Sequence, residues 1–535
     1  MNKYIKNTFR TGMALSVAML AFYSCSDSWD DHYDTTGDVS GRLTIWESLK
    51  KNGLTDFCEV VSKVGRDTML NSDQTFTVWA PVNGSFNKDS LLTAVSEGKK
   101  KQVIERFVNN YISRYNISDN GEAIDITMLN SKRNEMTSGM IGDAKITSAN
   151  NICSNGVLHI INNQLPFRFN IYEALELDPD FSSLYSFLSE YEEDSLDEGR
   201  SVSRGVDENG NKIWVDSVII ENNVMLNSLN ALINMEDSNY WAVVPTNEAF
   251  DSRVEEAMPY FVFNPTVENA DSLQELYAKR YSLYDSFFNM NQNTHPNDSL
   301  AATTYSSFNP LYNVFYHPYT TVNDTAGILT NIDQEISCSN GMAYKFSKWP
   351  LSIYDTFFRE IKVEIERTSN VNTSDTYTKA SNLSYYSSAA DSISRGYVDI
   401  VPSSSTANPQ IGVNLYDYLS GTYDIYVVML PKTVMTTSST DFRPYKFRAT
   451  LYEMNEKGDY KQETKLMDGG TTSNNPYCVD TVYIDTHTFT NSFVGQNSYG
   501  AILTINSYIL SRETSDYSRE MLIDCVILKP HKDDE

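Results

Sequence analysis

Three short blocks of this sequence occur twice in the same order, and this duplication restricts the fold to architectures that contain two similar domains. Within each pair the two copies share apolar positions, and the second and third pairs also share Pro, Asn or Gly residues. The pairs are residues 45–49 with 171–175, residues 78–86 with 242–250, and residues 153–159 with 338–344. Three blocks in a conserved order indicate a tandem duplication.

Each block has a local structure that follows from its residue types. In residues 78–86 an apolar, β-prone run ends at Pro81, which cannot donate to a strand ladder. We expect Asn83 to cap a following helix that buries Phe86. In residues 153–159 an Asn-Gly pair supplies positive φ for a tight turn, after which apolar residues alternate as in a strand.

The blocks resemble the fasciclin domain family, through Pro-x-Asn-x-x-Phe after a strand and through Asn-Gly-Val-Leu-His-Ile. The resemblance covers residues 41–167 and 168–350. It implies two α/β domains that serve extracellular adhesion or ligand display rather than catalysis. The motif residues, all with an expected structural role, are Pro81, Asn83, Phe86, Asn155, Gly156, His159, Pro245, Asn247, Phe250, Asn340 and Gly341.

The second copy departs from the family pattern in two places. The histidine of the motif is His159 in the first copy, whereas the second copy has Tyr344. The second copy also carries an insertion rich in Asn, Ser and Tyr near residues 286–325. We interpret His159 as a buried histidine with satisfied hydrogen bonds rather than as an adhesive residue.

Residues 351–535 change to short β-prone runs separated by turn signals. The expected strands are residues 361–366, 397–401, 411–415, 423–430, 445–452, 482–489, 501–509 and 521–528. About eight such runs predict an all-β antiparallel sandwich. Their order is similar to that of jelly-roll carbohydrate-binding modules, but architecture by itself does not give function.

A glycan-binding surface in this part of the chain would have to use tyrosine, because all six tryptophans lie before it. Sugar rings stack on exposed aromatic faces. Tyr416 and Tyr418 would point to the same face if the strand at 411–415 continued. They are therefore candidate glycan-binding residues, and the alternative is that both pack under a loop.

The N-terminus has the features of a secreted lipoprotein. Residues 1–24 join a basic start to an apolar run too short to span a bilayer, and Cys25 follows. This resembles a bacterial lipoprotein signal, which implies lipid on Cys25; an ordinary signal peptide is the alternative. Residues 25–40 form an acidic tether similar to the surface-export signal of glycan-foraging Gram-negative bacteria.

No catalytic, metal-binding or cofactor motif is recognisable in the sequence. The remaining cysteines show no CxxC pattern, although Cys478 and Cys525 could pair. The dense acidic run at 190–198 is expected to be a solvated loop, because acid–base catalysis needs buried, opposed carboxylates. The net charge of −28 disfavours nucleic-acid binding.

The tripeptide Asp-Ser/Thr followed by an aliphatic residue, Met or Thr is frequent in this chain. It resembles the O-glycosylation acceptor of the same bacterial group; the alternative is that these residues cap helices and turns. Candidate acceptors are Thr68, Ser90, Ser195, Ser272 and Ser299.

Together these features predict a non-enzymatic lipoprotein that is anchored in the outer membrane and faces the cell exterior. The expected role is accessory glycan binding or assembly beside a TonB-dependent, SusC/SusD-type importer, with an extracellular glycan or protein as ligand. The alternative is an adhesin that binds neighbouring cells or host matrix.

Overall fold

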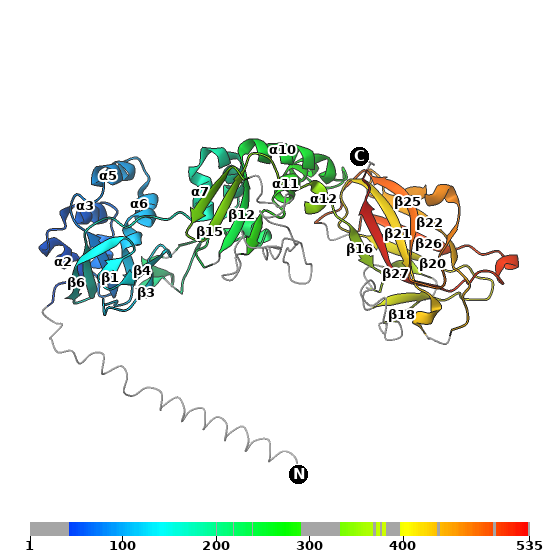
Figure 1. Ribbon diagram of the computed structural model, residues 1–535, viewed down its shortest axis with the longest axis horizontal. Coiled ribbons are helices and arrows are strands. Elements are labelled where there is room, and N and C mark those ends of the chain that lie inside the picture. Colours follow the sequence, from blue (N-terminus) through cyan, green and yellow to red (C-terminus); the bar gives the residue numbers. More distant parts are fainter. Residues whose placement is uncertain are drawn as a thin grey trace, which may run out of the picture. The chain divides into compact units, whose positions relative to one another are not determined.

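The computed structural model describes residues 42–532 except 200, 218, 238, 290–331, 367–370, 375–376, 381–395, 436–438 and 496–498. The chain divides into two compact units at Arg168–Phe169 (Figure 1). This division falls next to the predicted boundary between residues 167 and 168. Cys25, Ser299 and nearly all of the predicted insertion at 286–325 lie outside the described residues. Among the described residues, no helix has both the length and the apolar character needed to span a membrane.

The first unit consists of helices packed against a seven-stranded sheet with the order β2-β1-β7-β6-β5-β4-β3. Its helices are α2 (Ile45–Lys51), α3 (Thr55–Lys63), α4 (Asp67–Leu70), α5 (Lys88–Ser96), α6 (Lys100–Arg106) and the 3₁₀ turn η2 (Val108–Tyr111). Its strands are β1 (Phe76–Pro81), β2 (Ile112–Arg114), β3 (Ile124–Thr127), β4 (Arg133–Thr137), β5 (Met140–Ile141), β6 (Ala144–Cys153) and β7 (Gly156–Ile161). The expected strand–turn–strand at residues 153–159 is the β6–β7 hairpin.

The second unit begins with a smaller version of the same arrangement. Its four-stranded sheet has the order β13-β12-β15-β14. The elements are α7 (Ile171–Leu177), η3 (Pro179–Phe181), α8 (Ser182–Ser189), α9 (Val224–Ser228), β12 (Tyr240–Pro245), α10 (Asn247–Ala257), η4 (Met258–Phe261), α11 (Ala270–Ser282), β13 (Phe287–Asn289), β14 (Gln334–Cys338) and β15 (Gly341–Phe346). Two hairpin pairs precede β12: β8 (Glu192–Leu196) with β11 (Ile219–Asn223), and β9 (Val202–Val206) with β10 (Lys212–Asp216).

The two copies share one pairing geometry, which confirms the predicted duplication. In the first, β1 runs parallel to β7 with Phe76 opposite Gly156. In the second, β12 runs parallel to β15 with Tyr240 opposite Gly341. Each copy thus places two strands from distant parts of the chain side by side at its centre.

A buried asparagine connects three segments in each copy. The Asn155 Oδ1 accepts from the Ile45 backbone N–H at 2.8 Å, and its Nδ2 donates to the carbonyls of Leu70 and Ser72 at 2.9 and 2.7 Å. The same side chain therefore holds the start of the first helix and the loop before the central strand. Its three bonds satisfy backbone groups that have no partner in a helix or sheet.

Asn340 makes the equivalent contacts in the second copy. Its Oδ1 accepts from the Ile171 N–H at 2.9 Å, and its Nδ2 donates to the carbonyls of Ile233 and Met235 at 2.7 and 2.9 Å. The Asn-Gly pair was predicted to serve a turn. The structure gives its asparagine this further function, which links segments more than a hundred residues apart.

The glycine after each asparagine is required for two reasons. Gly156 and Gly341 have φ of 140° and 138°, which side chains rarely adopt. A Cβ on Gly156 would lie 1.8 Å from the Phe76 carbonyl oxygen, and one on Gly341 would lie 1.9 Å from that of Tyr240. The parallel pairing of the central strands therefore depends on the missing side chain.

The C-terminal part of the second unit contains two six-stranded sheets. One has the order β18-β19-β27-β21-β25, with β16 also on β27; the other has β17-β20-β26-β22-β23, with β24 on β22. The strands are β16 (Ile361–Glu364), β17 (Val371–Ser374), β18 (Tyr377–Ala380), β19 (Tyr397–Ile400), β20 (Gln410–Leu415), β21 (Gly421–Met429), β22 (Lys446–Met454), β23 (Tyr460–Lys465), β24 (Thr472–Ser473), β25 (Asp480–Phe489), β26 (Ala501–Ser507) and β27 (Met521–Pro530). Short helical segments are α12 (Ile353–Thr356), η7 (Lys432–Val434), η8 (Leu466–Gly469) and η9 (Ser511–Glu513).

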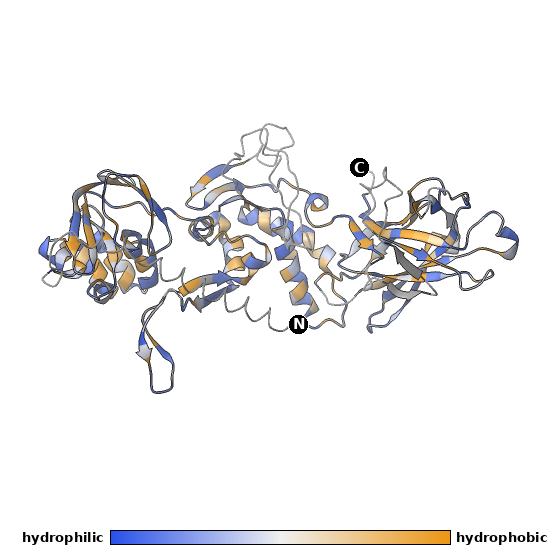
Figure 2. Ribbon diagram, turned by 90° about the horizontal axis from the view of Figure 1, so that it is seen from below, coloured by the Kyte–Doolittle hydropathy of each residue, from blue (hydrophilic) through white to orange (hydrophobic). Residues whose placement is uncertain are grey.

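All the strand ranges expected from the sequence coincide with strands of these sheets. The inward faces of both sheets contribute to one apolar core. Apolar residues are concentrated along their central strands (Figure 2). Strand β27 lies in the interior of its sheet, paired with β16 and β19 on one side and β21 on the other.

This core extends into the second fasciclin-like copy. Phe261 and Phe263, from η4 and the residues after it, belong to the same buried cluster as the two sheets. The backbone also crosses the junction, because the Ser420 N–H donates to the Tyr260 carbonyl at 3.0 Å and the Ser492 N–H donates to that of Val262 at 2.6 Å. Part of the second copy therefore packs into the core of the C-terminal sheets within the second unit, while most buried residues of the second copy form clusters of their own.

We expect Asn155→Ala to destabilise the first unit by about 3 kcal/mol, because it leaves three buried backbone groups without partners at roughly 1 kcal/mol or more each. Urea unfolding of residues 42–168 measures this loss. Asn163→Ala is the matched control, since Asn163 is exposed and bonds only within its own turn in the described contacts. Equal stability of the two variants would contradict the role of Asn155.

We expect Phe261→Ala to lower the stability of the second unit by about 3–5 kcal/mol, because Phe261 is fully buried where the second copy packs into the core of the C-terminal sheets. Calorimetry of residues 26–535 should show a single transition for residues 169–535 that moves to lower temperature. The transition of the first unit is the internal control and should not move. Separate transitions for the second copy and the C-terminal sheets would show that the core is not shared.

Candidate functional site

The motif asparagines after the central strands do not cap the helix that follows them, which corrects the prediction for Asn83. The Asn83 Nδ2 donates to the Gly53 carbonyl at 2.8 Å, and its Oδ1 accepts from the Asp56 N–H at 3.0 Å. Helix α5 begins later and is capped by Asn87. Asn83 therefore fixes the turn between α2 and α3, at a position the sequence alone did not indicate.

Asn247 has the corresponding partners in the second copy. Its Nδ2 donates to the Pro179 carbonyl at 2.9 Å, and its Oδ1 accepts from the Ser183 N–H at 2.8 Å. Here α10 starts directly at Asn247, and Thr246 is its cap. Phe250 is buried, as expected, whereas Phe86 is half-buried before α5 and packs on Phe107. Pro81 and Pro245 end the central strands as predicted.

His159 is a fully buried structural residue. Its Nε2 lies 3.0 Å from the Ile117 carbonyl, its Nδ1 accepts from the Asn150 N–H at 3.4 Å, and its ring stacks on Trp79 at 5.5 Å. A carbonyl on one nitrogen and an N–H on the other require the neutral ring. Burial lowers the pKa of His159 in agreement with this. Its counterpart Tyr344 is also buried.

The candidate glycan-binding pair is not a surface platform, so this prediction is wrong for Tyr418. Strand β20 ends at Leu415, and Asp417 has φ of 52°, which interrupts the alternation on which the prediction depended. Tyr418 is 2% exposed and packs on Phe489 with ring centroids 4.3 Å apart. Tyr416 is half-buried and contacts Tyr499 edge-on. The alternative, packing beneath a loop, holds for Tyr418.

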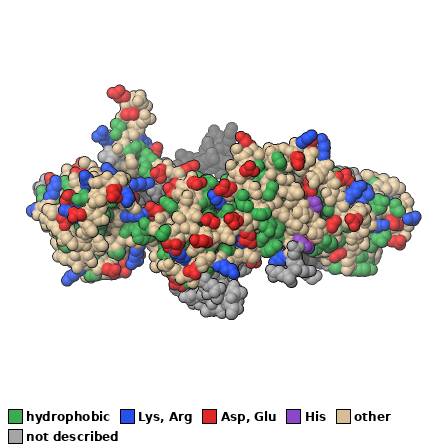
Figure 3. Space-filling model, turned by 90° about the horizontal axis from the view of Figure 1, so that it is seen from above, with side chains coloured by type: hydrophobic (Ala, Val, Ile, Leu, Met, Phe, Trp, Pro, Cys, Tyr) green, Lys and Arg blue, Asp and Glu red, His purple; other side chains and the backbone are tan. Residues whose placement is uncertain are grey.

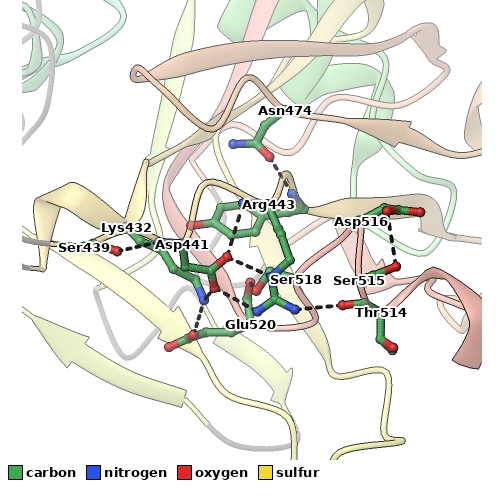
Figure 4. Close-up of polar contacts among 11 residues, drawn as sticks. Lys432, Ser439, Asp441, Arg443, Asn474, Thr514, Ser515, Asp516, Ser518 and Glu520 are labelled. Carbon is green, nitrogen blue, oxygen red and sulfur yellow. Dashed lines mark hydrogen bonds and ion pairs between the residues drawn. The ribbon is translucent and has the colours of Figure 1, made fainter.

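A network of charged side chains lies at one end of the C-terminal sheets (Figure 4). The Asp441 carboxylate accepts from Arg443 Nε and NH2 at 2.8 and 2.9 Å and from Lys432 Nζ at 2.7 Å. Lys432 also pairs with Glu520 at 2.7 Å, and Arg443 NH1 donates to the Thr514 carbonyl at 2.8 Å. The loop that carries Asp441 and Arg443 is therefore fixed to the sheets by several charged contacts.

The charged side chains of this network shift one another's pKa values. Bonding to Arg443 holds the pKa of Asp441 well below its usual range. Burial disfavours the charged form of Lys432, but its bonds to Asp441 and Glu520 outweigh this and raise its pKa. Burial, reinforced by neighbouring Glu520, raises the pKa of Asp399 to about 6. Sequence reasoning missed these residues because they lie far apart in the chain and form no motif.

The acidic run at 190–198 lies partly in strand β8, so it is not a loop as predicted. Its side chains are nevertheless mostly exposed, and Glu192 accepts from the Tyr172 hydroxyl. Exposed carboxylates on a hairpin lack the enclosed, opposed geometry that acid–base catalysis requires. Acidic side chains are also spread over the face of the molecule in Figure 3 rather than gathered in one patch.

Cys478 and Cys525, which the sequence left open as a possible disulfide pair, are free thiols, as are Cys58 and Cys153. Glu364, Asp524 and Cys525 have possible ligand atoms within 4.8 Å of one another. Lys362 lies in the same group, with its Nζ 3.1 Å from Glu364 and 3.6 Å from Asp524. The Lys362 ammonium group therefore offsets the negative charge of the Glu364 and Asp524 carboxylates.

The candidate O-glycosylation residues that the structure describes are exposed. Thr68 lies in α4, Ser90 and Ser272 lie in the first turns of α5 and α11, and Ser195 lies in β8. Their positions at helix starts also fit the alternative that Asp-Ser/Thr serves local capping.

Comparison with known proteins supports one of these domains at the level of sequence. Residues 52–166 match the Fasciclin domain family. No curated protein matches the chain.

Several solved structures are similar at low identity. A FAS1 domain pair from the insect cell adhesion molecule fasciclin I is 15% identical, with 57% of this chain and 99% of that chain covered and a TM-score of 0.20. An exo-β-1,3-galactanase from Phanerochaete chrysosporium is 10% identical (32% and 29% covered, TM-score 0.19). A carbohydrate-binding module that recognises mannan is 10% identical (32% and 99% covered, TM-score 0.18).

These TM-scores are too low to carry an argument about function. The assignment therefore rests on the sequence match of the first copy and on the repeated asparagine, glycine and strand geometry of the second. Residues 52–166 are thus similar to the Fasciclin domain, and the second copy repeats the parallel pairing of the central strands of the first.

Proposed function

We propose that this protein is a non-enzymatic, surface-exposed lipoprotein that captures glycans beside a TonB-dependent, SusC/SusD-type importer in the outer membrane. Cys25 carries the lipid, and residues 25–40 form the tether. The C-terminal sheets form a jelly-roll-like sandwich that binds the glycan, and the fasciclin-like pair displays it. The candidate Asp-Ser/Thr sites carry O-linked glycans.

One observation supports glycan capture by the C-terminal part. Most of the exposed aromatic side chains of the described residues lie there, namely Phe442, Tyr477, Tyr483 and Tyr508, whereas Tyr115 and Phe169 lie elsewhere. Aromatic rings in water are costly unless a ligand covers them, and sugar rings present the apolar faces that stack on them. The charge of −28 disfavours anionic ligands such as nucleic acids.

A second candidate function is adhesion to neighbouring cells or host matrix, which the Fasciclin domain at residues 52–166 favours. In that case the ligand would be a protein or matrix polymer, and the first unit would take part in binding. The two functions therefore differ in which unit carries the binding surface.

We expect residues 169–535 to bind neutral polysaccharides as well as residues 26–535 do, and residues 42–168 not to bind them. Both fragments follow the division into compact units, each with its own core. Affinity electrophoresis in gels that contain galactomannan, arabinogalactan, dextran or xyloglucan measures the retardation. Binding by residues 42–168 alone would favour the adhesin.

We expect Cys25→Ala to release the protein from the membrane fraction, because the acyl chains of the lipidated cysteine supply about 0.8 kcal/mol per buried methylene. Fractionation followed by immunoblotting measures the distribution. Cys58→Ala is the matched control, since it removes another cysteine and leaves the signal unchanged. Full membrane retention of Cys25→Ala would refute the lipid anchor.

A further inference from the structure

Two exposed rings, Phe442 and Tyr477, are stacked on each other on the surface of the second unit. Their centroids are 5.0 Å apart and their planes differ by 19°. Phe442 is 38% exposed and Tyr477 is 69% exposed. In a stacked pair, one ring covers one face of the other. One face of the Tyr477 ring therefore stays exposed, and Phe442 packs against the other face.

The loops that carry these rings are held together by reciprocal hydrogen bonds. The Tyr445 N–H donates to Asn474 Oδ1 at 2.7 Å, and the Asn474 N–H donates to the Tyr445 carbonyl at 3.3 Å. Tyr445 and Asn474 are both buried, and the Tyr445 hydroxyl donates to the Leu430 carbonyl at 2.9 Å. Buried hydrogen bonds of Tyr445 and Asn474 thus hold the two loops together.

The turn around Tyr477 is fixed as well. The Tyr477 N–H donates to Asn475 Oδ1 at 3.0 Å, and the Asn475 N–H donates to Asp480 Oδ2 at 2.6 Å. On the other loop, Asp441 and Arg443 flank Phe442 and belong to the charged network described above. An exposed ring on a rigid support loses little conformational entropy when a ligand covers it.

We infer that Tyr477, backed by Phe442, is a stacking site for a neutral pyranose unit of a glycan. This inference rests on the proposed glycan-binding function and names its site and ligand class. The positive charges of Lys432 and Arg443 are matched by Asp441 and Glu520, so the surroundings favour an uncharged ligand. Arg443, which is partly exposed, and Asp441 offer a donor and an acceptor for hydroxyl groups.

A sugar fits this surface better than a protein partner does. Stable protein interfaces bury roughly 800 Å² on each side around an apolar centre. Here two exposed rings form the aromatic surface, and their sequence neighbours include the polar Asp441, Arg443 and Asn475 beside the partly exposed Pro476. One or two pyranose rings match the size of this surface.

The test compares variants of residues 26–535 by titration calorimetry against galactomannan, arabinogalactan, dextran and xyloglucan, with polygalacturonate as an acidic probe. Tyr477→Ala should weaken binding of the neutral polysaccharide about threefold to tenfold, as expected for the loss of one stacking contact. Tyr477→Phe should retain binding. Phe442→Ala should weaken it too, because the ring loses its support.

Tyr483→Ala is the matched control. Tyr483 is 49% exposed, lies on β25, and contacts Tyr426 edge-on rather than by stacking. It should leave binding unchanged, and the thermal midpoints of Tyr477→Ala and Tyr483→Ala should both equal that of the unaltered chain.

Three results would overturn the inference, and they differ in what else they affect. Unchanged polysaccharide binding by Tyr477→Ala would refute this site and leave the proposed function intact. Preferential binding of polygalacturonate would refute the neutral ligand class. No binding of any polysaccharide by the unaltered chain would refute both the site and glycan capture.

Discussion

The side chain of one buried asparagine holds each fasciclin-like domain together. Asn155 and Asn340 each use one acceptor and one doubly donating amide to join a helix start to two carbonyls of a remote loop. An aspartate at this position would lack the donors, and a glutamine would be one methylene too long. The adjacent glycine lets the central parallel strands approach. The Asn-Gly pair therefore fixes helix, loop and sheet together, and this explains why it recurs in both copies.

The second copy has a further role, because Phe261 and Phe263 extend from it into the core of the C-terminal sheets. Glycines at the junction allow close contact: a Cβ on Gly421 would lie 2.9 Å from the Phe358 ring. The ring of Tyr260 also packs on Phe358, with centroids 4.6 Å apart. The second fasciclin-like domain thus packs against the C-terminal sheets and positions the loops that contact it.

The sequence was informative where a pattern is local or repeated. The duplicated blocks predicted the domain pair, and period-2 alternation predicted the strands of the C-terminal sheets, because a strand buries every second residue. The sequence was less informative where contacts with distant residues determine which partners a side chain binds. Asn83 bonds backward to the α2–α3 turn instead of capping forward, and this choice depends on a segment about thirty residues away.

The candidate glycan-binding residues illustrate the same limit. Tyr418 was assigned to the surface by extending a strand that ends at Leu415, and the left-handed Asp417 then breaks the alternation. Phe442 and Tyr477 lie within turn sequences, Asp-Phe-Arg-Pro and Asn-Pro-Tyr, where an aromatic residue is unusual. That signal is visible in the sequence, but the stacking of the two rings is not, because it depends on how two loops meet.

The position of β27 has a consequence for how the chain acquires its structure. This strand follows all its partners in the sequence, and it lies inside its sheet between strands that are synthesised long before it. The sheet cannot close until residues 521–530 are available, so most of its pairings are non-local, a property that slows folding. A chain whose residues 521–530 are still inside a ribosome or a translocation pore has this sheet open, and the sheet closes only after they emerge.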